Sequence, residues 1–450
     1  MVGKVLAPRN TKKAMKPLRI GLLGIGTVGG GTFDVLTRNA EEISRRAGRP
    51  LSVVRVAARN EAKARKVVPA SIPVVTDFRA VVRDPEVDVV VEMMGGYEPA
   101  KALILDAIEH GKHVVTANKA LLAVHGNEIF SAARAKGVIV AFEAAVAGGI
   151  PIIKALREGL VANRIEWIAG IINGTTNFIL SEMRSKGLAF ADVLKQAQAK
   201  GYAEADPTFD IEGVDAGHKI SILAALAFGI PLSFDKAHIE GITKIEAIDI
   251  RYAEEMGYRI KLLGIARRRA AGIELRVHPT LIPARRLIAN VEGVMNAVLV
   301  KGDAVGATLY YGAGAGAQPT ASAVIADLVD VARLIDADVN HRVPYLAFQP
   351  DRIGSEPVLP IDEVESSYYL RLRVDDRPGV LADITRVLAD NMISIDAMLQ
   401  KEPAEGEAQT DIILLTHETI EGRIRRAIAA IEAQPSTRGK IVLLRLENLA

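Results

Sequence analysis

The chain has 450 residues, of which 49% are hydrophobic and 24% are charged, and its formal net charge at neutral pH is +2. This composition is typical of globular domains, while the near-neutral charge and the 4% of aromatic residues give no reason to expect nucleic-acid binding. The chain contains no cysteine, which excludes disulfides, thiolate metal sites and enzymes that need a thiol nucleophile, such as phosphorylating aldehyde dehydrogenases.

Residues 1–17 are basic but lack the apolar segment of a secretory signal, so we expect a disordered tail there. No uncharged apolar run approaches the length needed to span a membrane. The absence of cysteine fits a reducing compartment. We therefore expect a soluble, cytoplasmic protein without a membrane partner.

A regular alternation of strands and helices begins at Leu18. A short apolar strand leads into Gly24-x-Gly26-x-x-Gly29, and a helix is expected from Thr27. This pattern is the dinucleotide fingerprint, in which glycines let the backbone approach a pyrophosphate at a helix N-terminus. Further strands are expected at residues 51–58, 73–77, 87–96 and 113–119, with a helix at 99–111. The alternation predicts an α/β fold, a Rossmann-type doubly wound parallel sheet over residues 18–145, joined by a returning helix at 321–340.

The end of the second strand bears on the choice of cofactor. NAD-binding proteins usually place Asp or Glu there for the ribose 2′-hydroxyl, whereas a nearby Arg suits the 2′-phosphate of NADP. Here Arg59 and Asn60 follow the strand, and Lys63 and Lys66 come next. The lysines are equally well explained as the solvated start of a helix. Arg59 favours NADP, with NAD as the alternative.

Residues 146–320 are expected to form a separate α+β domain for catalysis and dimerisation. A turn of small residues from Glu143 leads into a helix at 151–160, and strand-like runs recur at 165–172, 273–282 and 291–302. Asn173-Gly174 is a tight-turn signal between a β-rich segment and a helix. The strand-rich composition suggests a homodimer. Further association through the C-terminal domain would give a homotetramer.

The most distinctive stretch of the chain ends at Lys219. Asp206 before Pro207 is typical of a helix start. Asp215 and Lys219 are four residues apart, so they share one face of a helix whose other positions are nearly all apolar. A lysine among carboxylates indicates an acid–base centre, and an ordinary surface ion pair is the alternative. Asp210 precedes Lys219 by nine residues, so on a single helix the two side chains would lie on opposite faces. Asp210 can therefore join the same site only if it lies in a loop ahead of the helix. The alternative is that Asp210 is a charge in the first turn of the helix.

The C-terminal part of the chain has its own pattern. Residues 341–366 contain four prolines and few periodic residues, which indicates a linker. Residues 367–450 follow the order βαββαβ of a ferredoxin-like domain. With Arg377-Pro378-Gly379 at its first strand–helix turn, this domain resembles an ACT domain, a family that binds small effectors, often amino acids. A domain that serves only packing is the alternative.

The stretch before Lys219 carries a second resemblance. Ala197-x-x-x-Gly201-Tyr202, followed by Asp206-Pro207-x-x-Asp210-Ile211-x-Gly213-x-Asp215-x-x-x-Lys219, closely resembles the signature of homoserine dehydrogenases. The resemblance covers residues 18–336. It implies reversible NAD(P)H-dependent reduction of L-aspartate 4-semialdehyde to L-homoserine, in threonine, methionine and isoleucine biosynthesis.

The same resemblance implies roles for individual residues. Lys219 matches the family's proton-transferring lysine, and Asp215 would orient it or position a water. Glu204 would bind the ammonium group of the substrate, with Asp210 as a further binding candidate. Lys119 would line the gap between cofactor and substrate, and is a third catalytic candidate. The candidate cofactor-binding residues are Gly24, Gly26, Thr27, Val28, Gly29, Arg59, Lys119 and Gly314.

A turn near the start of the middle domain resembles one in which backbone carbonyls of the family hold a monovalent cation such as sodium. The matching positions are Glu143, Val146, Gly148 and Ile150. A packing turn built from small residues is the alternative.

Two other functions remain open at this point. One is another NAD(P)-dependent dehydrogenase of small hydroxy acids, and the other is a non-catalytic nicotinamide-nucleotide sensor, which would need the Gly24 loop but neither Asp215 nor Lys219. The family resemblance also implies regulation by L-threonine at the Arg377-Pro378-Gly379 turn. Since the linker contains several prolines, we expect only loose mechanical coupling between that domain and the rest.

Overall fold

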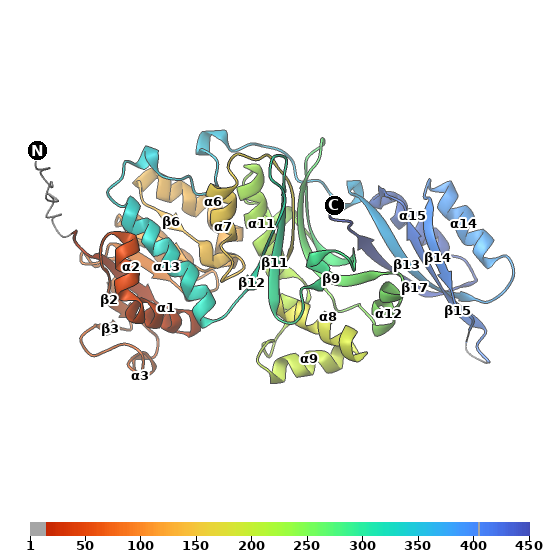
Figure 1. Ribbon diagram of the computed structural model, residues 1–450, viewed down its shortest axis with the longest axis horizontal. Coiled ribbons are helices and arrows are strands. Elements are labelled where there is room, and N and C mark those ends of the chain that lie inside the picture. The colour runs from red at the N-terminus through yellow and green to blue at the C-terminus, as the bar shows by residue number, and fades with distance from the viewer. Residues whose placement is uncertain (1–14, 404–405) are drawn as a thin grey trace, which may run out of the picture. The chain divides into compact units, whose positions relative to one another are not determined.

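The computed structural model describes residues 15–403 and 406–450 (Figure 1). The tail expected at residues 1–17 therefore lies, up to residue 14, outside the described residues. The described chain divides into two compact units. The first runs to Leu121 and adds Glu128–Ala144 and Gly316–Arg342, and the second comprises Leu122–Asn127, Ala145–Ala315 and Val343–Ala450. No helix in the described ranges combines the length and apolar composition needed to cross a membrane.

The first unit is built on a parallel sheet that has six strands in the described part of the chain, in the order β3-β2-β1-β4-β5-β6. The strands are β1 (Leu18–Leu23), β2 (Leu51–Ala57), β3 (Val74–Val75), β4 (Val89–Glu92), β5 (His113–Thr116) and β6 (Val140–Ala141). The strand order reverses between β1 and β4, which is where doubly wound sheets bind ligands at the carboxyl ends of their strands. The predicted Rossmann-type fold is confirmed.

Helices connect these strands and pack on the sheet. They are α1 (Thr27–Arg38), α2 (Ala40–Ala47), α3 (Glu61–Ala64), α4 (Arg79–Val82), α5 (Ala100–Glu109), α6 (Lys119–Lys136) and α13 (Ala317–Leu334). Helix α13 returns from late in the chain and lies directly on α1. A Cβ on Gly31 would stand 2.5 Å from the carbonyl oxygen of Ala317, so only glycine permits this approach.

The second unit contains a largely antiparallel sheet, which in the described residues runs β12-β11-β7-β9-β10-β17-β13-β15-β14 with two short strands beside it. Its strands are β7 (Ile165–Ile171), β8 (His238–Ile239), β9 (Tyr258–Arg268), β10 (Ile273–Pro283), β11 (Met295–Gly302), β12 (Gly306–Ala313), β13 (Glu365–Asp375), β14 (Ile395–Gln400), β15 (Gln409–Thr416), β16 (Thr419–Ile420) and β17 (Thr437–Leu446). The pairs β10–β17 and β10–β8 are parallel.

The second unit also contains helices and turns. They are α7 (Ile152–Lys154), the π-helical turn η2 (Ala155–Gly159), α8 (Gly174–Lys186), α9 (Phe190–Ala199), α10 (Thr208–Ile211), α11 (Val214–Phe228), η3 (Phe234–Lys236), α12 (Ala247–Glu255), η4 (Leu287–Asn290), η6 (Pro350–Arg352), η7 (Ile361–Glu363), α14 (Val380–Asp390) and α15 (Glu421–Glu432). Of these, α8, α11 and α12 pack on strands of this sheet. The turn η1 (Glu143–Ala145) and η5 (Val339–His341) complete the described elements.

The C-terminal domain has the predicted βαββαβ order, with the short strand β16 added before α15. Its core is formed by residues from the sheet and from both helices, among them Tyr368, Leu370, Ile384 and Ile424, all of which are fully buried. The ferredoxin-like arrangement is confirmed.

The attachment of this domain differs from the loose connection that the prolines suggested. Strand β17 pairs with β10, with Thr280 opposite Arg445 and Leu281 opposite Leu446. Glu447 extends the pairing, because its N–H donates to the carbonyl of Leu281 at 3.0 Å. The expectation of loose coupling is therefore wrong: strand pairing fixes the domain to the middle sheet, and linker composition carries no information about such a contact.

Candidate active site

The loop after β1 has the geometry that a dinucleotide requires. Gly24 has a left-handed φ of +99°, and a Cβ on Gly29 would stand 2.3 Å from the carbonyl oxygen of Gly24. At Gly26, in contrast, no described atom beyond the adjacent residues lies within 4 Å of a built Cβ. Gly26 is also the N-cap of α1. The first turn of α1, which includes Thr27 and Val28, contains no acidic residue. The loop thus leaves open space at a helix N-terminus, which suits a pyrophosphate.

A cavity of about 540 Å³ opens beside this loop. Gly24 and Gly26 line it together with Arg59, Asn60 and Lys63 from the segment after β2. Asn60 caps α3 by accepting the N–H of Lys63 at 2.9 Å. The structure therefore brings Gly24, Gly26 and Arg59 to one cavity, where the residues present fit a dinucleotide.

The lysine and aspartate of the predicted acid–base centre form a buried ion pair on α11. The Nζ atom of Lys219 lies 2.7 Å from Oδ2 of Asp215 and 2.7 Å from the carbonyl oxygen of Ile172. Only 8% of Lys219 and 3% of Asp215 are exposed. The surface-pair alternative is excluded by this burial, and Asp215 in the first turn of α11 also suits the helix dipole.

Asp210 belongs to the same cluster but to a different helix. Gly213, with a φ of +83°, separates α10 from α11, so Asp210 approaches from the segment ahead of the lysine's helix. Burial and the charge of Asp215 raise the pKa of Asp210, while the hydrogen bond from Asn173 and the charge of Lys219 oppose that shift. The cluster holds one cation and two carboxylates in a largely buried place.

Asn173 links the two carboxylates, and the sequence did not reveal this role. Its Nδ2 donates to Oδ1 of Asp210 at 2.7 Å and to Oδ2 of Asp215 at 2.9 Å. Its Oδ1 accepts the N–H of Thr176 at 2.8 Å, which makes Asn173 the N-cap of α8. The tight turn read from Asn173-Gly174 is thus a helix start. Asn before a helix is the signal that could have indicated the cap, but its link to Asp210 is tertiary.

Thr175 is a further residue of this cluster that the sequence did not indicate. Its hydroxyl donates either to the carbonyl of Tyr202, at 2.7 Å, or to Oδ2 of Asp210, at 3.2 Å. It therefore ties the start of α8 to the loop that precedes α10.

The remaining substrate and cofactor candidates lie in several places. Glu204 is exposed in the loop between α9 and α10, where its backbone carbonyl accepts a hydrogen bond from Gln198. Lys119 begins α6, directly after Asn118, whose side chain caps that helix. Gly314 follows β12, and a Cβ there would stand 1.9 Å from Nδ2 of Asn296. Lys119 and the glycine loop belong to the first unit, whereas Glu204 and Gly314 belong to the second.

The candidate cation turn has an unusual backbone. Ala147 and Gly148 both have left-handed φ angles, +55° and +46°. A Cβ on Gly148 would stand 2.5 Å from the carbonyl oxygen of Gly314. Val146 and Ile150 are buried, and so is Glu143 at the start of η1. Among the described residues, no group of three or more His, Cys, Asp or Glu side chains could hold a metal ion.

These features define a class of protein. A glycine loop at the switch point of a parallel sheet and a buried lysine–carboxylate cluster on an α+β domain are typical of nicotinamide-dependent dehydrogenases. Comparison with known families agrees. Residues 24–143 match the NAD-binding domain of homoserine dehydrogenase, residues 151–329 match the homoserine dehydrogenase family itself, and residues 368–436 match the ACT domain.

Relatives match over nearly the full chain. Homoserine dehydrogenase from Pseudomonas aeruginosa is 62% identical over 97% of this chain and all of its own length, and that from Neisseria gonorrhoeae is 61% identical over the same shares. The crystal structure of a homoserine dehydrogenase from Thiobacillus denitrificans is 68% identical, with a TM-score of 0.93, and covers 97% of this chain and 100% of its own. The chain belongs to the homoserine dehydrogenase family and is an NAD(P)-dependent oxidoreductase that acts on a CH–OH group.

Proposed function

We propose that the chain catalyses the reversible reduction of L-aspartate 4-semialdehyde to L-homoserine with NADPH, as a step in threonine, methionine and isoleucine biosynthesis in the cytoplasm. The observation that carries the proposal is the buried Asp215–Lys219 pair with Asp210 beside it. The test is the oxidation of NADPH on addition of L-aspartate 4-semialdehyde. A purified chain that binds NADPH but does not oxidise it with this aldehyde would contradict the proposal.

In the proposed reaction, bound NADPH supplies the hydride to the aldehyde carbon. Lys219 then gives a proton from Nζ to the oxygen as it becomes an alkoxide, and recovers a proton from solvent. Asp215 and the carbonyl of Ile172 hold that amine in a fixed direction. In the reverse direction the Lys219 amine would accept the hydroxyl proton, and the hydride would pass to bound NADP. Lys119 is proposed to line the space between cofactor and substrate.

Substrate binding is proposed to depend on the carboxylates that precede α11. Asp210 and Glu204 are the candidates for holding the ammonium group of the amino acid. Glu204→Gln should raise the Michaelis constant for homoserine about tenfold, since a hydrogen bond between two charged groups is lost, with a smaller change in turnover. Asp192→Asn, an equal charge change on the exposed face of α9, should leave both constants unchanged. An unaltered Michaelis constant in the Glu204 variant would remove Glu204 from the site.

The proposed preference for NADP is supported by Arg59 and Lys63, which line the nucleotide cavity. A hyperthermophilic archaeal homoserine dehydrogenase, 25% identical over 72% of this chain with a TM-score of 0.62, has been solved in complex with NADPH. Arg59→Ala should weaken NADPH binding about tenfold and NADH binding much less, because only NADPH offers a phosphate to the guanidinium. Lys66→Ala, an exposed cation nearby, is the control. Equal losses for both cofactors would show that Arg59 is not near the 2′ position.

We also propose that the carbonyls of Val146, Gly148 and Ile150, with Glu143, hold a monovalent cation such as sodium. The left-handed backbone of this turn supports the proposal, since it is strained for Ala147 and needs a compensating interaction. Replacing sodium in the assay by a bulky organic cation tests it, and unchanged turnover would remove the proposal.

The C-terminal domain is proposed to bind L-threonine at the Arg377-Pro378-Gly379 turn, between paired copies in a homodimer or homotetramer. Gly379 supports the proposal, because it caps α14 with a φ of +94° and leaves the first turn of that helix open. Millimolar threonine should inhibit the full chain, and Gly379→Asp should remain active but lose this inhibition. If threonine does not inhibit the full chain, the alternative that this domain serves only packing would be favoured. A point variant is preferable to truncation, because removal of β17 would expose β10.

A further inference from the structure

A short segment of the second unit lies directly against the start of the lysine's helix. We call it the bridging segment, residues 238–242. The N–H of Ile242 donates to the carbonyl of Ile211 at 2.8 Å. A Cβ on Gly241 would stand 2.2 Å from that same carbonyl oxygen. The backbone of the bridging segment therefore rests on the last residue of α10, one position after Asp210.

The same segment also contacts α11. A Cβ on Gly217, which lies between Asp215 and Lys219, would stand 2.6 Å from Cδ1 of Ile239. Gly213, at the turn between α10 and α11, faces the carbonyl of Glu240, 3.3 Å from its built Cβ. A displacement of the bridging segment by a few tenths of an ångström would therefore be transmitted to both helices that carry the acid–base cluster.

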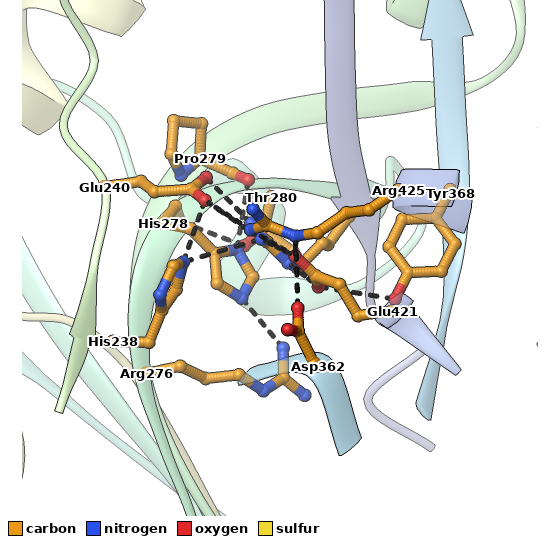
Figure 2. Close-up of polar contacts among 11 residues, drawn as sticks. His238, Glu240, Arg276, His278, Pro279, Thr280, Asp362, Tyr368, Glu421 and Arg425 are labelled. Atoms are coloured by element: carbon orange, nitrogen blue, oxygen red, sulfur yellow. Dashed lines mark hydrogen bonds and ion pairs between the residues drawn. The ribbon is translucent and has the colours of Figure 1, made fainter. Parts of the chain in front are cut away.

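On its other side, the bridging segment is held by the C-terminal domain (Figure 2). The carboxylate of Glu240 accepts hydrogen bonds from Nη1 and Nη2 of Arg445 at 2.8 and 2.9 Å, and it lies 2.8 Å from Nε2 of His238. Although burial alone would raise the pKa of Glu240, its hydrogen bonds to His238 and Arg445 lower it, so the carboxylate stays ionised at neutral pH. The link between Glu240 and Arg445 joins positions 205 residues apart in the sequence.

Arg445 is itself fixed. Its side chain is 1% exposed and lies on β17, opposite Thr280 of β10. Its Nε donates to Oε2 of Glu421 at 2.6 Å, and the hydroxyl of Tyr368 donates to the same oxygen at 3.3 Å. Because these contacts fix the guanidinium, its position determines the position of the Glu240 carboxylate. The backbone of the bridging segment is thereby held in place as well.

We propose that Glu240 is a positioning residue of the reaction. Held by Arg445, it presses the bridging segment against the turn between α10 and α11 and so sets the placement of Asp210 and Asp215 around Lys219. The inference rests on the roles proposed above for these three residues. It also gives the C-terminal domain a part in every turnover, whether or not an effector is bound.

Glu240→Gln, Arg445→Met and the double variant test the proposal in the full chain. Turnover should fall about 10- to 100-fold in Glu240→Gln, because small displacements of reacting groups are costly, while the Michaelis constant for NADPH should not change. The double variant should be no slower than the slower single variant, since either single change already removes the contact between Glu240 and Arg445. Rates are expressed per NADPH-binding site, which counts chains with a folded nucleotide-binding unit, and a melting curve of each variant reports the folding of the second unit. Lys440→Met, which removes an exposed pair with Glu432, is the control and should match the unaltered chain.

Two results would overturn the proposal. The first is a Glu240→Gln variant whose turnover per NADPH site is within twofold of the unaltered chain. The second is a loss that disappears when the assay is run well below the melting temperature of the variant, because Glu240 would then serve stability alone. Lys219→Met separates this failure from failure of the proposed function. If Lys219→Met is inactive while Glu240→Gln is normal, only the positioning role is lost.

Discussion

Lys219→Met is expected to lower turnover by about 10²- to 10⁴-fold in both directions, the range of a lost general acid–base group, while NADPH binding is unchanged. Methionine has nearly the length of lysine but offers no proton. The glycine loop and Arg59 belong to the other compact unit, so the nucleotide cavity has no reason to change. Steady-state rates with homoserine and with the aldehyde measure the first effect, and fluorescence titration with NADPH measures the second.

A matched control for this variant exists on α8. Lys186 pairs with Glu182 across one helical turn, as Lys219 does with Asp215, but its side chain is 47% exposed. Lys186→Met should therefore leave both rates unchanged. A Lys219→Met enzyme that keeps more than about a tenth of normal turnover would show that the proton comes from another group, since a lost general acid costs at least about a hundredfold.

Arg276→Met is expected to destabilise the second unit by about 3–5 kcal/mol, the cost of removing one member of a buried charge network. The arginine is fully buried on β10, where it donates to Oε2 of Glu274 at 2.8 Å and to Oε1 of Glu447 at 2.5 Å. Its Nη1 also lies 2.8 Å from Nε2 of His278 (Figure 2). Arg267 still reaches Glu447 at 2.7 Å and Arg269 still reaches Glu274 at 2.6 Å, which places the expected loss at the lower end. Calorimetric melting of the variant measures the effect.

Arg438→Met is the control for the stability prediction. Arg438 forms an ion pair with Asp375 in the same domain, but 46% of its side chain is exposed, so its loss should leave the melting temperature nearly unchanged. Adding Glu274→Gln to Arg276→Met should restore part of the stability, because one of the two buried carboxylates that lost Arg276 as a partner is then replaced by a neutral amide. An unchanged melting temperature in Arg276→Met would contradict the prediction, because it would mean that the buried carboxylates do not need this arginine for stability.

The sequence was most informative where the signal is local. The strands of the first unit are short apolar runs, and the glycine loop and the spacing of Asp215 and Lys219 are patterns within a few residues. Strand β9 was not predicted, because Lys261 interrupts its apolar run. That lysine is buried, which lowers its pKa to about 8, and its Nζ donates to the carbonyl of Val291 at 2.6 Å. Helix α6 was also missed, since its polar and apolar residues are not segregated to two faces.

Contacts between distant parts of the chain left no such pattern. Asn173 reaches Asp210 and Asp215 across 37 and 42 residues, and nothing in the residues between them indicates that approach. The pairing of β17 with β10 is another case, because each strand alone is an ordinary run of apolar and charged residues. A buried arginine such as Arg445 is indistinguishable in sequence from one that is solvated.

The hydrogen bonds between β10 and β17 limit how the C-terminal domain of this protein can be replaced by a domain from another protein. A C-terminal domain taken from another protein could not be exchanged by cutting in the segment 341–366 alone, because its last strand would have to run parallel to β10 and place a guanidinium opposite Thr280. It would also need a carboxylate at the position of Glu447 to meet Arg276. The boundary that matters for a chimera is therefore the final strand, and a graft that keeps β17 from this chain is the one that should fold.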